Sequence, residues 1–437
     1  MGRRLLLMTV CALGIAAPVR AQQPYNLWAP VKSLATLFTD IYGADGLIVD
    51  SLATLPGEQP HSAHFNSAFQ FDFSQFSTAL VSQLVSLPLP SPSSGFTYHF
   101  DPSLGVFQRT TQSFGPILAE RADTIGAGRA SFGFAYQRFT FDSMEGLDLR
   151  RVPAVFTHDN AVLLGGREDV VTTTNSISAT VGQATAFVTV GITDRFDVAV
   201  AVPIVNNDLK VVSEATIQRL GTTNPLTHFF RQSNGDVGEH RTFTAVGSAS
   251  GLGDVTVRLK GTLVHGVALG LDMRLPTGDE MQLLGTGTTG LQPFAAMSMT
   301  TGKISPHLNA SYKWNGSSVL AGNPATGQSA DFPDQFAYAA GADVGVNSRL
   351  TIALDLLGRY LKDATRLVVQ DFHALDGTSV FPNVAFERDS FNALSGSLGM
   401  KANVAGRLLV DVNLLFKLDE NGLRDKVTPL VGIEYAF

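Results

Sequence analysis

Apolar and polar residues alternate along much of the second half of the chain. In DVTVRLKGTLV, at 254–264, one face carries valine and leucine while the other carries threonine, arginine and lysine. The next stretch, VALGLDMRL at 267–275, repeats the pattern, and so do later stretches up to the C-terminus. Because successive side chains of a strand point to opposite faces, each stretch predicts a β-strand with one apolar and one polar face.

Three features favour a transmembrane antiparallel β-barrel over a soluble β-sandwich. Each stretch has about ten residues, the length that a tilted strand needs to cross a bilayer. Aromatic residues gather where the apolar faces approach the longer connections, as interfacial belts do. Short connections alternate with long ones, as in outer-membrane barrels, whose periplasmic turns are short. The short connections are 193–195, 264–266, 301–303, 347–349 and 405–407.

We expect an all-β fold with a barrel at 129–437. About twelve strands can be counted, within a range of twelve to fourteen, and an even number lets the first and last strands close antiparallel. The strands are expected at roughly 129–141, 169–192, 196–205, 254–264, 267–275, 293–301, 304–314, 334–346, 350–361, 391–404, 408–418 and 428–437.

The register across two short turns gives an independent check. Across VHG, Arg258 lies opposite Asp272, and across AGR, Lys401 lies opposite Asp411. Opposite charges directly across a strand pair are mildly favourable, whereas the same charges facing lipid would be strongly unfavourable. Both matches predict that the polar faces line the lumen.

The charged and polar residues expected to face the lumen are mixed in sign. Mixed signs argue against a strongly anion- or cation-selective pore, and they fit a lumen closed by ion pairs equally well. One stretch, PFAAMSMTTG, fits less well, because a three-residue TGK turn would direct Met297 and Met299 inward. The candidates for the lumen are Arg258, Lys260, Asp272, Arg274, His307, Lys313, Asp343, Asp355, Arg359, Lys401, Asp411, Lys417 and Glu434.

The chain ends in PLVGIEYAF, an alternating stretch whose last residue is aromatic. Terminal residues usually fray, so this pattern predicts a closing barrel strand with Ile433, Tyr435 and Phe437 facing outward. A terminal strand of this kind resembles the signal read by the outer-membrane barrel assembly machinery. That machinery is therefore an expected partner during biogenesis, beside lipid and lipopolysaccharide of the bacterial outer membrane.

The N-terminal part of the chain has a different character. Two arginines, a short apolar core and VRAQQ predict a secretory signal at 1–21, cleaved after Ala21. The apolar core is shorter than a membrane-spanning helix. In the segment 22–128, FSQFSTALVSQLVSL reads as a short helix, and SGFTYHF with LGVFQRT as a hairpin. The segment forms either a plug in the lumen or an extra pair of strands.

Composition narrows the class further. The formal charge is −7 and 16% of the 437 residues are charged, without a basic, aromatic-rich patch, so we expect no nucleic-acid binding. After the signal no 18-residue run is mainly apolar, which argues against membrane helices. The single cysteine, Cys11, lies within the signal, so no disulfide is expected in the mature chain.

Candidate chemistry is weak, and we expect no enzyme, no cofactor and no metal site. His307 and Ser311 share a face, but four positions along a strand span about 13 Å, beyond hydrogen-bond reach. His61 and His64 in HSAHF have metal-ligand spacing without an evident third ligand. The acids of LPTGDE, at 279–280, are expected to be only solvated.

Several stretches together resemble a family of bacterial outer-membrane barrels labelled as transporters of the phenol meta-cleavage (MetA) pathway. They are SGFTYHFDPSLGVFQR, ITDRFDVAVAVPIV, GLGDVTVRLKG, LGLDMRLPTGDEMQLLGTG, SPHLNASYKWNG and FPDQFAYAAGADVGVNSRLTIALDLLGR, which cover the chain from about residue 90. The resemblance implies a barrel and, with less force, uptake of aromatic or other small apolar compounds.

Three functions follow in order of preference. The first is a passive outer-membrane channel for small aromatic or apolar solutes. The second is a structural or adhesive barrel whose long loops, such as 206–250, bind a partner or lipopolysaccharide. The third is an outer-membrane hydrolase.

Overall fold

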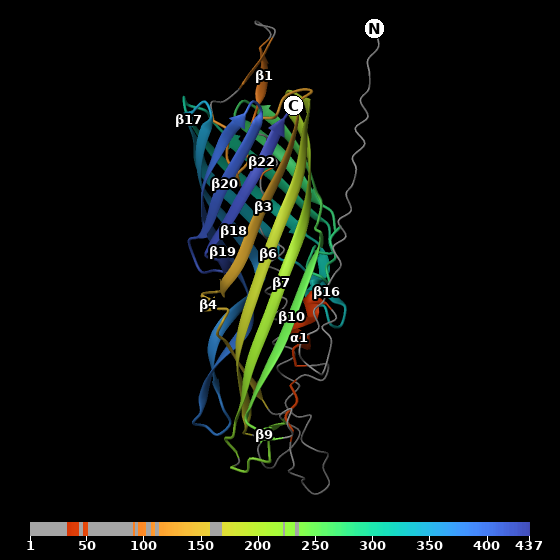
Figure 1. Cartoon of the computed structure of the whole chain (residues 1–437), viewed down its shortest axis with the longest axis vertical. Helices are drawn as coiled ribbons and strands as arrows, with labels where there is room; N and C mark the ends of the chain where they lie inside the picture. The colour runs from red at the N-terminus through yellow and green to blue at the C-terminus, as the bar shows by residue number, and fades with distance from the viewer. Residues whose placement is uncertain are drawn as a thin grey trace.

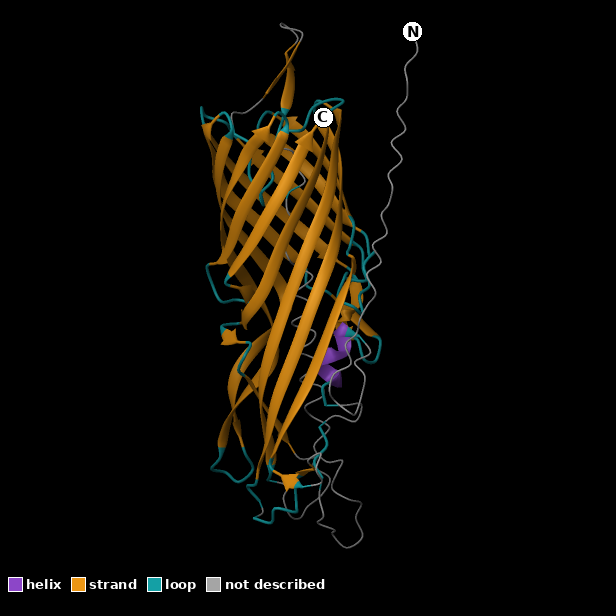
Figure 2. Ribbon diagram, in the orientation of Figure 1, coloured by secondary structure: helices purple, strands orange, loops and turns teal. Residues whose placement is uncertain are grey.

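The computed structural model describes residues 33–42, 47–50, 91, 95–101, 106–109, 113–157, 168–221, 223–231 and 236–437. These residues form a tall cylinder of tilted strands (Figure 1, Figure 2). Helical structure in the described part is confined to a short turn at Leu34–Thr36 and the adjoining α1 (Leu37–Asp40). No helix in the described part is long and apolar enough to span a membrane. The helix predicted in FSQFSTALVSQLVSL lies outside the described residues.

Twelve antiparallel strands close into a barrel, because the last of them pairs with the first. The predicted all-β, twelve-stranded barrel is thereby confirmed. In chain order its strands are β3 (Ala130–Met144), β6 (Val170–Thr193), β7 (Phe196–Gln218), β11 (Thr256–Val264), β12 (Val267–Arg274), β13 (Gly290–Ser298), β14 (Ile304–Asn315), β17 (Gln335–Asn347), β18 (Leu350–His373), β19 (Val380–Ala405), β20 (Leu408–Lys417) and β22 (Val427–Ala436).

The other strands are not part of this closed ring of twelve. β1 (Tyr98–Asp101) and β2 (Val106–Arg109) form the predicted hairpin as a separate sheet beyond the rim near the C-terminus (Figure 1). They therefore add no pair to the barrel. The remaining strands lie in the half of the molecule away from the C-terminus, where β4, β5, β10 and β21 pair with barrel strands. They are β4 (Leu147–Asp148), β5 (Val152–Thr157), β8 (Phe230–Arg231), β9 (Val237–Gly238), β10 (His240–Leu252), β15 (Ser317–Asn323), β16 (Gln328–Asp331) and β21 (Leu423–Asp425).

β7 is twice as long as predicted. Its outward face is apolar up to Ile204 and becomes polar from Asn206, while its inward face stays apolar at Leu209 and Val211. The outward face leaves the lipid at this point, but the strand continues and pairs with β10. The prediction that the strand ends at 205 and that 206–250 forms a long loop is therefore wrong.

β18 and β19 also run past the membrane. The predicted ends at 361 and 391 mark a bulge between Leu361 and Ala364, where Asp363 adopts a left-handed φ of 50°. Beyond the bulge the two strands pair again, up to His373 and Val380. The loss of a regular apolar face beyond residue 361 hid this extension from the sequence pattern.

Met297 and Met299 face outward, with half or more of their surface exposed. The inward direction derived from a three-residue turn is wrong. The connection between β13 and β14 spans 299–303, and Met297 pairs with Leu308. The two extra residues restore the alternation, so the apolar band continues without a break around this hairpin.

The exposed apolar side chains form an outward band on the half of the barrel that carries the short turns, whereas on β7 the outward face beyond that band is polar. Such a band matches the hydrocarbon layer that surrounds outer-membrane barrels. The protein is placed in the outer membrane, with its short turns and C-terminus at the periplasmic side by the general asymmetry of these barrels.

This placement makes a prediction about Leu356, an outward residue of β18 that is 42% exposed. Leu356→Arg should destabilise the barrel by about 2–4 kcal/mol, because the charge would face lipid. Val369→Arg serves as a matched control, since Val369 is exposed on the same strand beyond the bulge. Urea unfolding in lipid vesicles should show a lowered midpoint for the first variant alone. Equal midpoints would contradict the membrane position.

Candidate functional site in the lumen

The segment 113–128, between the β1–β2 hairpin and β3, lies inside the barrel at its periplasmic end. Asn309 of β14 binds both peptide groups of Glu120, accepting from its N–H at 2.7 Å and donating to its carbonyl at 2.6 Å. The Ala122 N–H donates to Ser298 Oγ at 3.0 Å, and Thr262 Oγ1 donates to the Ala122 carbonyl at 2.8 Å. Barrel side chains thus hold the backbone of this segment against the wall.

An ion cluster reinforces this attachment. The Glu120 carboxylate accepts from Arg258 and, at 2.9 Å, from Lys260 Nζ. Ser91 Oγ donates to it at 2.6 Å. Burial alone would raise the pKa of the Glu120 carboxyl, but the charges of Lys260 and Arg258 bring it below its ordinary value. Glu120 is therefore an anion at neutral pH, and its contribution to the attachment is lost only as the pH falls through that lowered pKa.

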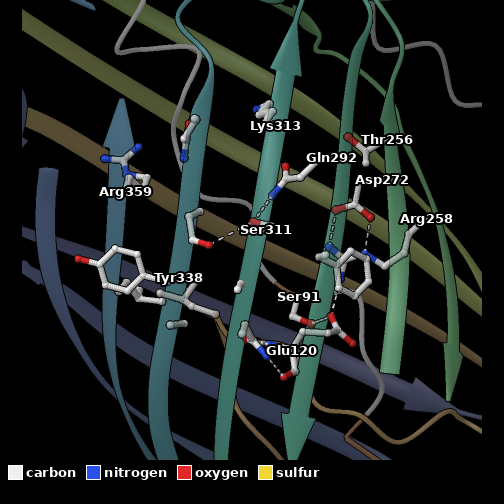
Figure 3. A pocket seen from close by; sticks show the side chains of 18 of the residues that line it. Ser91, Glu120, Thr256, Arg258, Asp272, Gln292, Ser311, Lys313, Tyr338 and Arg359 are labelled. Atoms are coloured by element: carbon white, nitrogen blue, oxygen red, sulfur yellow. Dashed lines mark hydrogen bonds and ion pairs between the residues drawn. The ribbon is translucent and has the colours of Figure 1, made fainter. Parts of the chain in front are cut away.

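On the extracellular side of this cluster lies a cavity of about 250 Å³. Glu120, Arg258 and Asp272 all line it, and Lys313 lies well away from Glu120 (Figure 3). Arg258 donates to both oxygens of Asp272 at 2.6 Å, and its guanidinium lies 4.7 Å from the Phe294 ring centre. The wall also includes small or apolar side chains: Leu118, Ala199, Ala201, Ala337, Ala339, Leu357 and Leu415.

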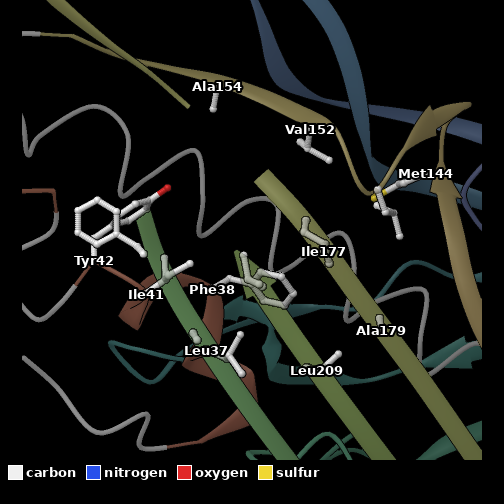
Figure 4. Packing of buried hydrophobic residues seen from close by; sticks show 14 of the residues in the cluster. Leu37, Phe38, Ile41, Tyr42, Met144, Val152, Ala154, Ile177, Ala179 and Leu209 are labelled. Atoms are coloured by element: carbon white, nitrogen blue, oxygen red, sulfur yellow. The ribbon is translucent and has the colours of Figure 1, made fainter. Parts of the chain in front are cut away.

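The extracellular half of the barrel is filled by an apolar cluster around α1 (Figure 4). Phe38 is fully buried there, and the Tyr42 hydroxyl lies 2.8 Å from Ser213 Oγ on β7. The Ala35 N–H donates to the Met281 carbonyl at 3.0 Å, which joins this segment to the loop between β12 and β13. Separate chain segments therefore occupy the periplasmic and the extracellular parts of the lumen.

The two predicted cross-strand pairs, Arg258 with Asp272 and Lys401 with Asp411, are confirmed by the register. The other lumen candidates fall into five places. Arg274, Lys313 and Arg359 line the cavity; Lys260 binds Glu120; His307 lies between Asp343 and Asp355; Lys417 pairs with Glu420 at 2.8 Å near Asp142; and Glu434 accepts the Gly95 N–H at 2.9 Å.

Sequence reasoning missed the residues that attach the lumen segment. Glu120 falls in a stretch without periodicity, so no register could place it opposite a barrel strand. Ser298 and Asn309 lie on predicted strands, but uncharged polar residues facing the lumen gave no sign of a partner. The available signal for this contact was an acidic residue in a stretch without apolar periodicity, directly before the first strand.

His307 and Ser311 bind different partners. His307 Nε2 lies 2.6 Å from Asp355, and Nδ1 lies 3.4 Å from Asp343. Ser311 Oγ accepts from Gln292 at 2.9 Å. This geometry gives His307 no contact with the serine hydroxyl that a hydrolase would need it to activate.

The candidate metal positions show no clustering. Asp279 Oδ1 accepts the Met281 N–H at 3.0 Å, and the adjacent Glu280 contacts Ser318 at 3.3 Å. In the part of the chain that the structure describes, no group of three or more His, Cys, Asp or Glu residues is arranged to hold a metal ion. His61 and His64 lie outside the described residues.

At the C-terminus Ile433, Tyr435 and Phe437 all face outward, each with more than 40% of its surface exposed. The rings of Tyr435 and Phe437 meet edge to face at 4.9 Å. Recognition of these three residues by the barrel assembly machinery stays a prediction.

The model of a family described as "Putative MetA-pathway of phenol degradation" matches residues 157–363, just under half of the chain. The resemblance inferred from the motifs is thereby confirmed. The match includes the stretches from ITDRF to DLLGR, whereas SGFTYHFDPSLGVFQR lies before it. No curated protein matches the chain.

Solved structures of outer-membrane channels are similar to the chain at low identity. The COG4313 outer membrane channel from Pseudomonas putida F1 is 14% identical with a TM-score of 0.42, covering 72% of this chain and 98% of that one. The CymD monoaromatic hydrocarbon channel is 9% identical with a TM-score of 0.35, covering 71% and 89%. The P. putida toluene transporter TodX is 11% identical with a TM-score of 0.30, also covering 71% and 89%.

Proposed function

We propose that the protein is a passive outer-membrane channel for small aromatic or apolar solutes. The observation that carries this proposal is a cavity of about 250 Å³, partly lined by alanine and leucine, inside a closed barrel. Its volume suits a single aromatic ring rather than a large polymer. The match to a family described by phenol degradation supports the solute class.

The segment 113–128 controls passage in this proposal, acting as a plug at the periplasmic end. Its contacts with the barrel wall are hydrogen bonds and ion pairs, so it can leave the wall without unfolding the barrel. The proposal assigns no catalytic role to His307 or Ser311, because each is engaged elsewhere.

Biogenesis completes the proposal. The chain is exported through a cleaved signal at 1–21, and the barrel assembly machinery reads the outward row Ile433, Tyr435 and Phe437. Lipid then covers the apolar band, and lipopolysaccharide meets the extended extracellular half.

Filling the cavity tests the function. Ala337 faces the cavity from β17, whereas Ala340, three residues along the same strand, faces outward. Ala337→Trp should lower the uptake of radiolabelled phenol by intact cells at least several-fold, because the indole would occupy the solute space. Ala340→Trp should leave uptake unchanged. Equal uptake by the parent and Ala337→Trp, at equal amounts of folded barrel, would contradict a route through this cavity.

A further inference from the structure

The cavity wall carries more positive than negative charge. Four of its side chains are cations and two are acids, namely Arg258, Arg274, Lys313 and Arg359 against Glu120 and Asp272. Both acids are already bonded to Arg258. Of the other cations, Lys313 and Arg274 have no carboxylate partner among the cavity-lining residues that the structure describes.

Lys313 shows this imbalance most clearly. Its ammonium makes no hydrogen bond or ion pair with any residue that the structure describes. The charges around it are mixed in sign: Arg274 and Arg359 repel the ammonium, and Asp272 and Asp254 attract it. A cation that lines a cavity without a hydrogen-bonded counter-ion is unfavourable, and an anion bound in the cavity would supply one.

Arg274 has capacity to share that anion. Its Nη2 donates to Asn315 at 2.9 Å, but its Nε makes no hydrogen bond with the described residues. The nearest carboxylate, Asp254, lies 3.6 Å from this nitrogen. Asp254 already accepts from the Gly278 and Thr286 N–H groups and from the Thr286 hydroxyl, so it compensates Arg274 only in part.

Lys313 lies nearer the extracellular end of the cavity than the small apolar side chains of β17 do. Lys313 pairs in register with Gln335, at the extracellular end of β17, whereas Ala337 and Ala339 follow on the same inward face toward the periplasm. Leu357 and Leu415 extend this apolar part. The geometry points to an apolar organic monoanion as ligand, such as an aromatic carboxylate, with its charged group at Lys313 and Arg274 and its ring against the alanines.

This inference rests on the proposed function and makes the solute class more specific. Its test is the binding of benzoate and of the neutral isostere benzamide to the full, refolded protein, measured by calorimetry. Benzoate should bind, and benzamide should bind at least tenfold more weakly. Lys313→Gln should weaken benzoate binding roughly 10- to 100-fold, the range expected for loss of a charged hydrogen bond, without changing benzamide binding. Lys313→Arg, which keeps the charge, should retain most of the benzoate affinity.

Lys362→Gln is the matched control, because Lys362 is exposed on β18 and does not line the cavity. Equal affinity for benzoate and benzamide, or unchanged benzoate affinity in Lys313→Gln, would overturn the anion site. If Lys313→Gln fails to refold, Lys313→Arg provides the test instead. If Lys313→Arg binds benzoate no more tightly than it binds benzamide, the anion site is overturned as well. These results are distinct from failure of the channel, which Ala337→Trp reports through uptake of phenol.

Discussion

Replacing Glu120 with glutamine is expected to open the lumen. The change removes the carboxylate shared by Lys260, Arg258 and Ser91. Arg258 keeps Asp272, and Lys260, which is only 4% exposed, keeps Asp197 at 3.9 Å and the Asp123 carbonyl at 2.8 Å. Breaking a buried ion pair from one side costs about 3–5 kcal/mol, so the attachment of the segment 113–128 should weaken greatly.

Single-channel recordings in planar bilayers provide the measurement. The parent protein should conduct rarely, and Glu120→Gln should raise the open fraction at least tenfold, since about 1.4 kcal/mol already corresponds to a factor of ten. Glu214→Gln is the matched control, because Glu214 is exposed on the outward face of β7. An unchanged open fraction in a folded Glu120→Gln barrel would show that the segment does not control passage.

A second variant isolates the ion pair from the rest of the attachment. Lys260→Met removes the cation and keeps an apolar stem of similar length. If Glu120 and Lys260 act through each other, the double variant should conduct about as much as the more open single variant. Additive effects would instead assign the opening to two independent changes.

The membrane half of the fold could be predicted because lipid imposes a simple rule. Every strand there must alternate, since outward residues meet hydrocarbon and inward residues meet the lumen. The rule also located Arg258 opposite Asp272 without any structural information. It failed where the lipid ends: Asn206 on β7 breaks the apolar row although the strand continues.

The site could be predicted only in part, for a related reason. Arg274, Lys313 and Arg359 were placed on the inward face by alternation, but alternation does not say which charges meet. The attachment of Glu120 depends on a segment that folds back into the barrel, a long-range contact with no period in the sequence. Inward charge can therefore be inferred from the pattern, whereas its pairing needs the three-dimensional arrangement.

Replacing His307 with leucine is expected to cause the largest loss of stability. His307, on β14, and Asp355, on β18, meet across Gly341 of the intervening β17. A Cβ at Gly341 would approach Asp355 Oδ1 to 2.3 Å and His307 Nε2 to 2.8 Å, so glycine makes room for the pair. All three side chains of the His307, Asp343 and Asp355 cluster are at most 2% exposed.

Leucine at 307 would leave two buried carboxylates facing each other without a donor between them. The expected cost is about 3–5 kcal/mol, which should appear as a lower urea midpoint or as failure to refold in vesicles. His373→Leu, at an exposed position of β18, should change the free energy of unfolding by about 0.5 kcal/mol or less.

Neutralising the acids together with the histidine separates charge from packing. In the triple variant His307→Leu, Asp343→Asn and Asp355→Asn, no buried charge remains, so most of the lost stability should return, as replacing a complete buried ion cluster by neutral groups is often tolerated. If the triple variant is no more stable than His307→Leu, the loss comes from packing around the imidazole. Recovery would show that the histidine is required because it compensates two carboxylates inside the barrel wall.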